Sequence, residues 1–432
     1  MKRLHILPFL CLIFACISYN TLRGTTPLMK IAISHEDSLK ISQYNETRQN
    51  ADEVTNDVQK PYLEGNSRDS VLMIQLDSIN FTLTDYPDSA REITPVRIAL
   101  LLNDIYGKKE MEFSKGFILG INKLKLPANS VSLKMINGEI PEDSLQWSLA
   151  EFLPDLIFTT QDNGASSVLT DYAGEHNTKI INVFDTKSEN YTSSPSMVQV
   201  LIPSHKFNVS AAIYLASQFE GAELIMVGEP QETDGMLKEI LNIWPGNFQT
   251  SILRDDIETF SYDPDKQYVF YITAGSNDEI RESLGRIKSL QIANPNLVTT
   301  VIGRPNWVAF NDLKNNIAGL DVYIPSKCYI DVTSEKESRW YIPEYKNLFG
   351  NAPIKSYPVY SIMGYDVASY FIPREFNELN NIGSDIWNDE ELLQLNISLA
   401  NDSWSSGQYN AGSYMLHFDG DGQLVKIPMK AE

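Results

Sequence analysis

The chain has 432 residues, of which 43% are hydrophobic, and it carries a formal net charge of −21 at pH 7. This length and apolar content can bury a large core, divided between two or more domains. The acidic balance argues against nucleic acid or an anionic membrane as the main partner, since both are bound through basic surfaces.

Residues 1–20 have the pattern of a secretory signal peptide. A short basic head precedes an apolar run at residues 4–17, which is too short to span a bilayer comfortably. A retained membrane anchor is the alternative. Residues 13–16 resemble a bacterial lipobox except at Phe14, so lipidation of Cys16 and cleavage by signal peptidase I both stay open. We therefore expect an exported protein, in the periplasm or at the outer membrane, that attaches to a membrane only if Cys16 is lipidated.

Residues 21–93 are predicted to form a polar linker. Up to about residue 70 the segment is polar and weakly patterned, with few side chains to offset the entropy of folding. Residues 71–83 are more apolar and fit a short strand or a docking segment.

A first series of alternating strands and helices begins after Pro95. Residues 96–102 form a continuous aliphatic run, typical of a strand covered on both faces. Residues 110–124 have helical spacing, and Gly116 and Gly120 lie one turn apart, which predicts that this helix approaches the sheet closely. The alternation continues to residue 184 with short loops, so we predict a parallel, doubly wound sheet.

A second series begins near residue 203 with a predicted helix over residues 207–219 and runs to residue 325. Another helix is predicted over residues 335–350, where Ser334 and Glu337 fit a capping box and Pro343 should kink or restart the helix. We therefore predict an α/β protein with two Rossmann-like lobes and a cleft between them. The expected boundaries are 94–203 for lobe 1, 204–325 for lobe 2, and 326–432 for the return to lobe 1 and a closing hairpin.

Neither the cysteines nor the glycine-rich stretch near the end of the sequence predicts a metal site. Outside the signal the chain has only Cys328, so no internal disulfide or cysteine-rich zinc site can form, and its apolar surroundings predict a buried side chain. The sequence Asp-Gly-Asp-Gly at residues 419–422 resembles the start of a calcium loop. Counting from Asp419, however, the twelfth position is Lys430 rather than an acidic residue. A hairpin turn is predicted there instead, with no metal and no cofactor.

Three stretches, residues 96–124, 341–371 and 413–427, resemble type I periplasmic binding proteins of the leucine/isoleucine/valine-binding group, the substrate-binding proteins of ABC transporters. The resemblance covers about residues 94–430. It implies an exported bacterial envelope protein whose two lobes are joined by three crossing strands and close on a ligand without catalysis. Within the second stretch Asp366 follows the Gly-Tyr-Asp motif, and we expect it to cap its helix or to interact with the helix dipole.

Candidate ligand-binding residues follow from the rule that open α/β sheets bind ligands beyond the carboxyl ends of their strands. Ser166 and Ser167 stand at a predicted helix N-terminus, where they can bind an anion or simply cap the helix. Arg304 can meet an anionic ligand or pair with a carboxylate. The remaining candidates at strand ends are Asn103, Thr160, Gln161, Asn163, Phe184, Asp185, Glu229 and Ser276.

Two departures from the family pattern concern the ligand. Residues 158–169 lack the Gly-Pro that usually follows the third strand, and residues 197–204 lack the arginine that often follows the fifth. These differences weigh against a free amino acid as the ligand, and the cleft could be repurposed or empty.

Catalytic motifs are absent from the sequence. The chain has no Gly-x-Ser-x-Gly elbow, no His-Glu-x-x-His and no phosphate-binding loop, and its five histidines are scattered. We therefore predict a non-catalytic solute-binding protein that closes on a small polar ligand, amino acid or peptide-like, for transport or sensing with an ABC permease. The alternative is an envelope lipoprotein on the same fold that binds a peptidoglycan synthase and regulates peptidoglycan synthesis.

Overall fold

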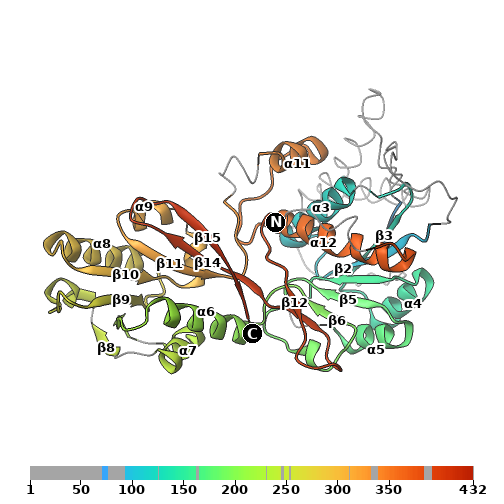
Figure 1. Ribbon diagram of the computed structural model, residues 1–432. Coiled ribbons are helices and arrows are strands. Elements are labelled where there is room, and N and C mark those ends of the chain that lie inside the picture. The colour runs from blue at the N-terminus through green and yellow to red at the C-terminus, as the bar shows by residue number, and fades with distance from the viewer. Residues whose placement is uncertain are drawn as a thin grey trace, which may run out of the picture.

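The computed structural model shows two α/β lobes side by side (Figure 1). It describes residues 71–75, 93–124, 126–161, 165–229, 231–244, 248–252, 254–310, 312–331, 339–383 and 392–431. The signal residues, Cys16 among them, and Asn163, Ser334 and Glu337 lie outside these ranges. In the described ranges we find no helix that is both long and apolar enough to cross a membrane.

The first lobe is built on an eight-stranded sheet. Its central strands run parallel, whereas the two edge strands, the first and the last below, are antiparallel to their neighbours. In spatial order the strands are β1 (Val71–Gln75), β3 (Val131–Asn137), β2 (Val96–Leu102), β4 (Leu156–Thr159), β5 (Lys179–Asn182), β6 (Met197–Gln199), β13 (Gln408–Asn410) and β12 (Leu399–Ala400).

The second lobe is built on a seven-stranded sheet. Five parallel strands are followed by an antiparallel hairpin at one edge. In spatial order the strands are β8 (Phe248–Ile252), β7 (Glu223–Val227), β9 (Gln267–Ile272), β10 (Val298–Ile302), β11 (Asp321–Ser326), β14 (Gly412–Phe418) and β15 (Leu424–Lys430).

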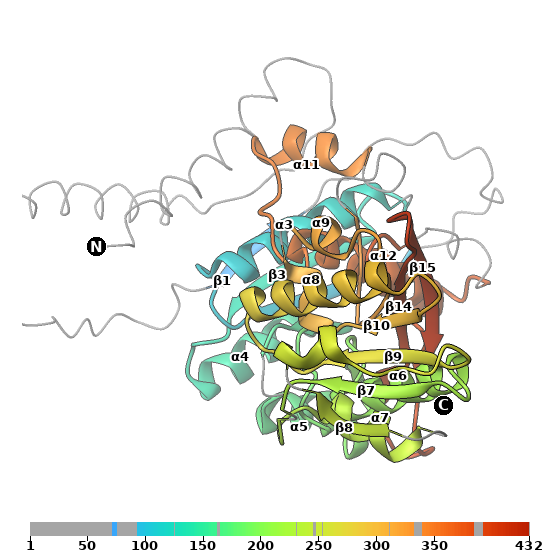
Figure 2. The same cartoon turned by 90° about the vertical axis from the view of Figure 1, so that its left-hand side faces the viewer.

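Helices cover both faces of each sheet, as the predicted doubly wound architecture requires. On β7, Leu224 and Met226 pack into one apolar cluster, while Ile225 and Val227 pack into another on the opposite face. Figure 2 turns this second lobe toward the viewer. The helices of the first lobe are α3 (Lys108–Lys123), α4 (Glu142–Phe152), α5 (Ser167–His176), α11 (Tyr341–Phe349) and α12 (Tyr360–Asn380), and those of the second are α6 (Ser204–Gln218), α7 (Gly235–Ile243), α8 (Asn277–Ala293) and α9 (Leu313–Ile317).

The predicted fold class is therefore confirmed: two lobes, each with a mostly parallel sheet between helices. Residues 326–431 contribute to both lobes, since they supply α11 and α12 to the first and the β14–β15 hairpin to the second. Helix α11 begins at Tyr341, so Pro343 lies in its first turn, where a proline restarts a helix at little cost.

The glycines of α3 serve a different contact from the predicted one. A Cβ atom added to Gly116 would lie 1.6 Å from the carbonyl oxygen of Ser361, and one added to Gly120 would lie 2.7 Å from the Cβ of Ala368. A Cβ atom added to Gly364 on α12 would likewise lie 2.1 Å from the carbonyl oxygen of Phe113. The prediction that this glycine face approaches the sheet is wrong, because the face packs against helix α12, some 250 residues later in the chain.

Asp366 does not cap its helix, contrary to expectation. It lies inside α12, is fully buried, and accepts backbone hydrogen bonds from Leu393 (2.8 Å), Gln394 (2.7 Å) and Leu395 (2.8 Å). Burial raises the pKa of Asp366 to about 7, even though the three N–H donors act in the opposite direction. The carboxyl group thus fastens the following segment to α12.

The chain crosses between the lobes at three places. It leaves β6 for α6, leaves β11 for α11, and passes from β13 to β14 with only Ala411 between the two strands. The hairpin that follows confirms the predicted glycine turn, because Gly422 has a φ of 78° and its N–H donates to the carbonyl oxygen of Asp419.

Candidate functional site

The carboxyl ends of the strands of both lobes are directed toward the junction between the lobes. The chain crosses over from the carboxyl ends of β6 and β11, and the neighbouring strands in each sheet run parallel to these two. In open α/β sheets this edge binds ligands. The residues selected from the sequence can therefore be located on the two edges that meet at the junction.

Two of the first-lobe candidates hydrogen-bond to each other. The backbone N–H of Asn103 donates to the Thr160 hydroxyl at 2.9 Å, and Thr160 is fully buried whereas the Asn103 side chain is exposed. Gln161 is half-buried, and its N–H donates to the Thr159 hydroxyl at 3.3 Å. Asn103 is thus the member of this group that presents a side chain to solvent.

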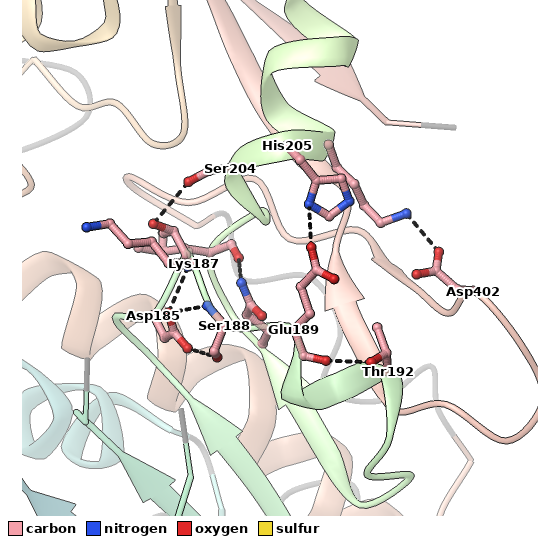
Figure 3. Close-up of polar contacts among 12 residues, drawn as sticks. Asp185, Lys187, Ser188, Glu189, Thr192, Ser204, His205 and Asp402 are labelled. Carbon is pink, nitrogen blue, oxygen red and sulfur yellow. Dashed lines mark hydrogen bonds and ion pairs between the residues drawn. The ribbon is translucent and has the colours of Figure 1, made fainter. Parts of the chain in front are cut away.

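Phe184 and Asp185 stabilise their own loop. The Phe184 ring is buried edge-on against the rings of Phe113 (5.3 Å) and Tyr360 (5.4 Å). The Asp185 carboxylate accepts from the backbone N–H groups of Lys187 (2.8 Å) and Ser188 (3.0 Å), and also from the Ser188 hydroxyl (Figure 3). Asp185 is almost completely buried, and these bonds fix the conformation of the chain that follows β5.

Ser166 and Ser167 lie at the start of α5, as predicted. Ser166 is the N-cap residue, and its carbonyl oxygen accepts from Leu169 and Thr170, but its hydroxyl makes no capping bond. Ser167 is exposed in the first turn. The two hydroxyl groups are therefore placed beside a helix N-terminus at the carboxyl end of β4.

Of the second-lobe candidates, one is exposed and another is hydrogen-bonded within its own helix. Glu229 is exposed just beyond the end of β7. Ser276 caps α8 in a capping box with Glu279, whose carboxylate accepts from the Ser276 hydroxyl at 2.8 Å.

Arg304 takes the alternative role considered from the sequence and pairs with a carboxylate. Its Nε atom lies 3.3 Å from the buried Oδ2 of Asp234, which also accepts from the Tyr271 hydroxyl at 2.8 Å. Burial raises the pKa of Tyr271 well above its usual value, so the phenol stays protonated and donates. The guanidinium is thereby neutralised within the second lobe.

The first turn of α6 brings polar residues to the junction that the sequence analysis did not select. The backbone N–H of Ser204 donates to the Thr186 carbonyl at 2.8 Å, and the Ser204 hydroxyl donates to the Thr186 hydroxyl at 3.3 Å. The next residue, His205, places its Nδ1 atom 3.3 Å from Oε1 of Glu189 (Figure 3). The predicted helix began only at residue 207, so this turn was left outside it.

Lys206 and Lys327 complete the polar side of the junction. Lys206 Nζ lies 2.8 Å from Oδ1 of Asp402, in the loop between β12 and β13. Lys327 Nζ donates to the Ser204 hydroxyl at 2.8 Å, and in the described ranges no carboxylate comes within ion-pairing distance of it. Burial lowers the pKa of Lys327 to about 8. A lysine inside the apolar run of residues 322–330 was the available sequence signal.

Cys328 is buried, as predicted. Burial raises the pKa of its thiol to about 12, so the reactive thiolate is scarce at neutral pH. Within the described ranges no cluster of histidine, cysteine, aspartate and glutamate could hold a metal ion.

A small cavity lies between α8 and α9, and Asn277, which follows the candidate Ser276, is among its lining residues. Its volume is about 110 Å³, and Ile280, Leu284, Phe310 and Leu313 contribute its apolar lining. Ligand pockets usually have volumes of roughly 300–1,000 Å³. The junction therefore remains the candidate site.

Comparisons with known proteins relate the chain to others through its fold. No protein-family model matches the sequence, and no curated protein matches it. A substrate-binding protein of an ABC transporter from Desulfitobacterium hafniense, in complex with Leu, has 12% identity and a TM-score of 0.42, with 77% of this chain and 100% of that chain covered. An ABC-type branched-chain amino acid transporter protein from Rhodopseudomonas palustris has 13% identity and a TM-score of 0.46, with 78% and 97% covered.

Full-length LpoA from Haemophilus influenzae is also similar, with 14% identity, a TM-score of 0.46 and 78% of this chain covered. The match spans 60% of the length of LpoA. The substrate-binding group that the sequence resembled is thus among the similar solved structures. At these identities the likeness is one of fold.

Proposed function

We propose that the chain is a non-catalytic binding protein of the bacterial cell envelope that holds a small polar ligand between its lobes. One observation carries this proposal: the carboxyl ends of parallel strands from both sheets meet at the lobe junction and bear polar side chains. Binding there would draw the lobes together by rotation about the three crossings, as in hinge closure.

Some of the candidate side chains already have partners within their own lobe, and this restricts the class of ligand that the junction can bind. Asp185 is occupied by its own loop and Arg304 by Asp234. The charged groups at these two positions are therefore not free to receive the ammonium and carboxylate of a free amino acid. Exposed Asn103, Ser167 and Glu229 offer amide, hydroxyl and carboxylate groups instead. These groups suit a peptide-like ligand with several amide groups to bind.

Thermal unfolding in the presence of amino acids, short peptides and muropeptides tests the proposal. A ligand present at 100 times its dissociation constant should stabilise the fold by about 2.7 kcal/mol. We expect peptides to raise the melting temperature more than free amino acids do. If no compound shifts the transition at millimolar concentration, the protein does not bind solutes of these classes.

Two glutamates at opposite ends of β7 provide a matched pair of variants. Glu229 follows the carboxyl end of the strand, and Glu220 precedes its amino end, and both side chains are exposed. Glu229→Ala should weaken the ligand-induced shift, whereas Glu220→Ala should leave it unchanged. Equal shifts in both variants would place the ligand away from this edge.

A second candidate function, an interaction module that binds an envelope protein such as a peptidoglycan synthase or an ABC permease, is favoured by one surface residue. Trp404 is 95% exposed in the loop between β12 and β13. The Ser406 hydroxyl bridges the backbone N–H and carbonyl of Ser403, at 3.1 and 2.9 Å, so the loop presents Trp404 on an ordered turn. Exposed tryptophans are frequent energetic anchors of protein interfaces.

Affinity capture from envelope extracts separates the two functions. The interaction module should retain a synthase or permease, and Trp404→Ala should release it. Recovery of the bait alone with a co-purified small molecule would instead favour solute binding. Mass spectrometry of the native protein would report the small molecule and also whether Cys16 carries a lipid, which is what attachment to the outer membrane requires.

A further inference from the structure

Three consecutive residues at the beginning of the second lobe each contact the first lobe. Ser204 is bonded to Thr186, His205 to Glu189, and Lys206 to Asp402, across the first crossing between the lobes (Figure 3). Because Asp402 lies in the β12–β13 loop, just before the β13–β14 crossing, the Lys206 contact links the end of the first crossing to the start of the third. We call these three contacts the α6 clasp.

The first-lobe partners of the clasp are held in place by their own loops. The Asp185 bonds to Lys187 and Ser188 shape the turn that ends at Glu189, and the Glu189 carbonyl accepts from the Thr192 hydroxyl at 2.7 Å. On the other side, the Asn401 side chain donates to the Ser403 carbonyl at 2.9 Å, which orders the loop around Asp402. The backbone that carries the two carboxylates is therefore ordered on both sides of α6.

The clasp is polar and open to solvent, whereas the packing beside it is apolar. The His205 and Glu189 side chains are 53% and 58% exposed, and those of Lys206 and Asp402 are 16% and 41% exposed. Below them a single buried cluster continues from Ile157 and Tyr191 of the first lobe to Phe207 and Met226 of the second. Salt screens exposed ion pairs, whereas it does not screen apolar packing.

Lys206 is well suited to remain charged in this position. Burial lowers its pKa, but hydrogen bonds with Asp402 and Tyr409 and their charges outweigh this effect and raise it. Its Nζ atom also lies 4.4 Å from the centre of the Tyr409 ring on β13, a cation–π contact that further joins it to the first lobe. Lys206 is therefore the strongest single attachment of the clasp.

We propose that the α6 clasp sets the angle between the two lobes in the unliganded protein and that ionic strength loosens it. The apolar cluster then acts as the pivot, and the Lys206–Asp402 ion pair with the two neighbouring polar contacts acts as the restraint that selects one orientation. The clasp bears on the proposed function because a ligand that closes the lobes must strain or release these contacts. Its existence does not depend on which ligand is bound.

Interlobe distance measurements on the full chain test this proposal. A fluorescent pair is introduced as unnatural amino acids at the exposed positions Asp143 in α4 and Ser289 in α8, so that the native cysteines are left unlabelled. In the wild type, raising the salt from about 0.05 to 1 M should broaden the distance distribution and shift its mean by several ångströms. The double variant Lys206→Met/Glu189→Gln should show the broad distribution already at low salt, with little further response.

The matched control is Lys266→Met, which removes a lysine–carboxylate pair of 3.2 Å to Glu223 that lies wholly within the second lobe. It should reproduce the wild-type distribution and its salt response. A double variant that behaves like the wild type at low salt overturns the clasp, and so does a control that behaves like the double variant.

Ligand titrations on the same labelled protein keep the two proposals apart. If the double variant changes the distance distribution but no solute does, the result supports the clasp and counts against solute binding. A distribution that narrows with ligand yet is unchanged by the clasp variant supports solute binding and overturns the clasp.

Discussion

The contact between α3 and α12 and the contact at the lobe junction are built in opposite ways. In the first, glycine backbones touch and a buried carboxyl group fastens the next segment. In the second, polar and charged side chains bridge the lobes at the surface above an apolar cluster.

The difference between these two contacts indicates which parts of the molecule can move relative to each other. Close backbone packing has no alternative arrangement at similar energy, so α3 and α12 form one rigid unit. Exposed ion pairs contribute little individually and can be exchanged for water, so the junction can change its geometry without unfolding either lobe. Three substitutions examine this contrast, in order of decreasing expected effect.

Gly116→Ala should cause the largest loss of stability. The new methyl group would lie 1.6 Å from the Ser361 carbonyl oxygen, and its next two nearest atoms also belong to the Ser361 backbone. We expect a loss of about 3–5 kcal/mol in the free energy of unfolding, measured by urea denaturation. The control is Gly285→Ala in the middle of α8, where an added methyl meets nothing within 4 Å and should stabilise by about 0.5–1 kcal/mol. Equal effects at the two glycines would refute the close packing.

Asp366→Asn should have an intermediate effect that depends on pH. Replacing one carboxyl oxygen with an amide turns an acceptor of backbone hydrogen bonds into a donor, which we expect to cost about 2–3 kcal/mol. Because burial raises the pKa of Asp366 to about 7 in the fold, its protonated form stabilises the native state at low pH. That contribution is lost as the pH rises through 7, by at most about 1.4 kcal/mol per pH unit.

The difference in stability between the wild type and this variant should therefore be larger at pH 5 than at pH 9. Taking the difference in the free energy of unfolding between the two proteins removes the effect of pH on the many other acidic residues, which is common to both. A difference that is constant with pH would mean that the Asp366 carboxyl has the same charge in the folded and unfolded chains.

Lys327→Met should have the smallest effect and the opposite sign. Burial lowers the pKa of Lys327 to about 8, and no carboxylate in the described ranges pairs with it, so its charge is unfavourable below that pH. We expect the variant to be more stable at pH 7 by about 1 kcal/mol, allowing for partial exposure of the lysine. The advantage should disappear as the pH rises through 8 toward 10.5, because deprotonation then favours the folded wild type. A variant less stable than the wild type at pH 7 would show that the Ser204 contact outweighs the burial of charge.

Much of the architecture could be predicted from local sequence patterns. The aliphatic run at residues 96–102 is β2 without any shift in its ends, and the glycine turn at residues 419–422 connects the last two strands. These features depend on residues close together in the chain, where periodicity and turn chemistry are informative.

Contacts between distant segments could not be read in the same way. The spacing of Gly116 and Gly120 indicated a close approach but not the partner, which is α12. Similarly, Ser204, His205 and Lys206 carry no motif, and their role depends on Glu189 and on Asp402, almost 200 residues away. The Arg304–Asp234 pair also depends on the folded arrangement, although a carboxylate partner was one of the alternatives open from the sequence.

The route of the chain has a consequence for attempts to divide the protein. The first lobe needs α12 to cover the glycine face of α3, and the second needs β14 to pair with β11, so each lobe is completed only by the last quarter of the chain. A fragment that ends at residue 330 would expose the backbone of one lobe and a sheet edge of the other. Isolated lobes should therefore be engineered by circular permutation or by grafting the C-terminal segments, and simple truncation should yield aggregating fragments.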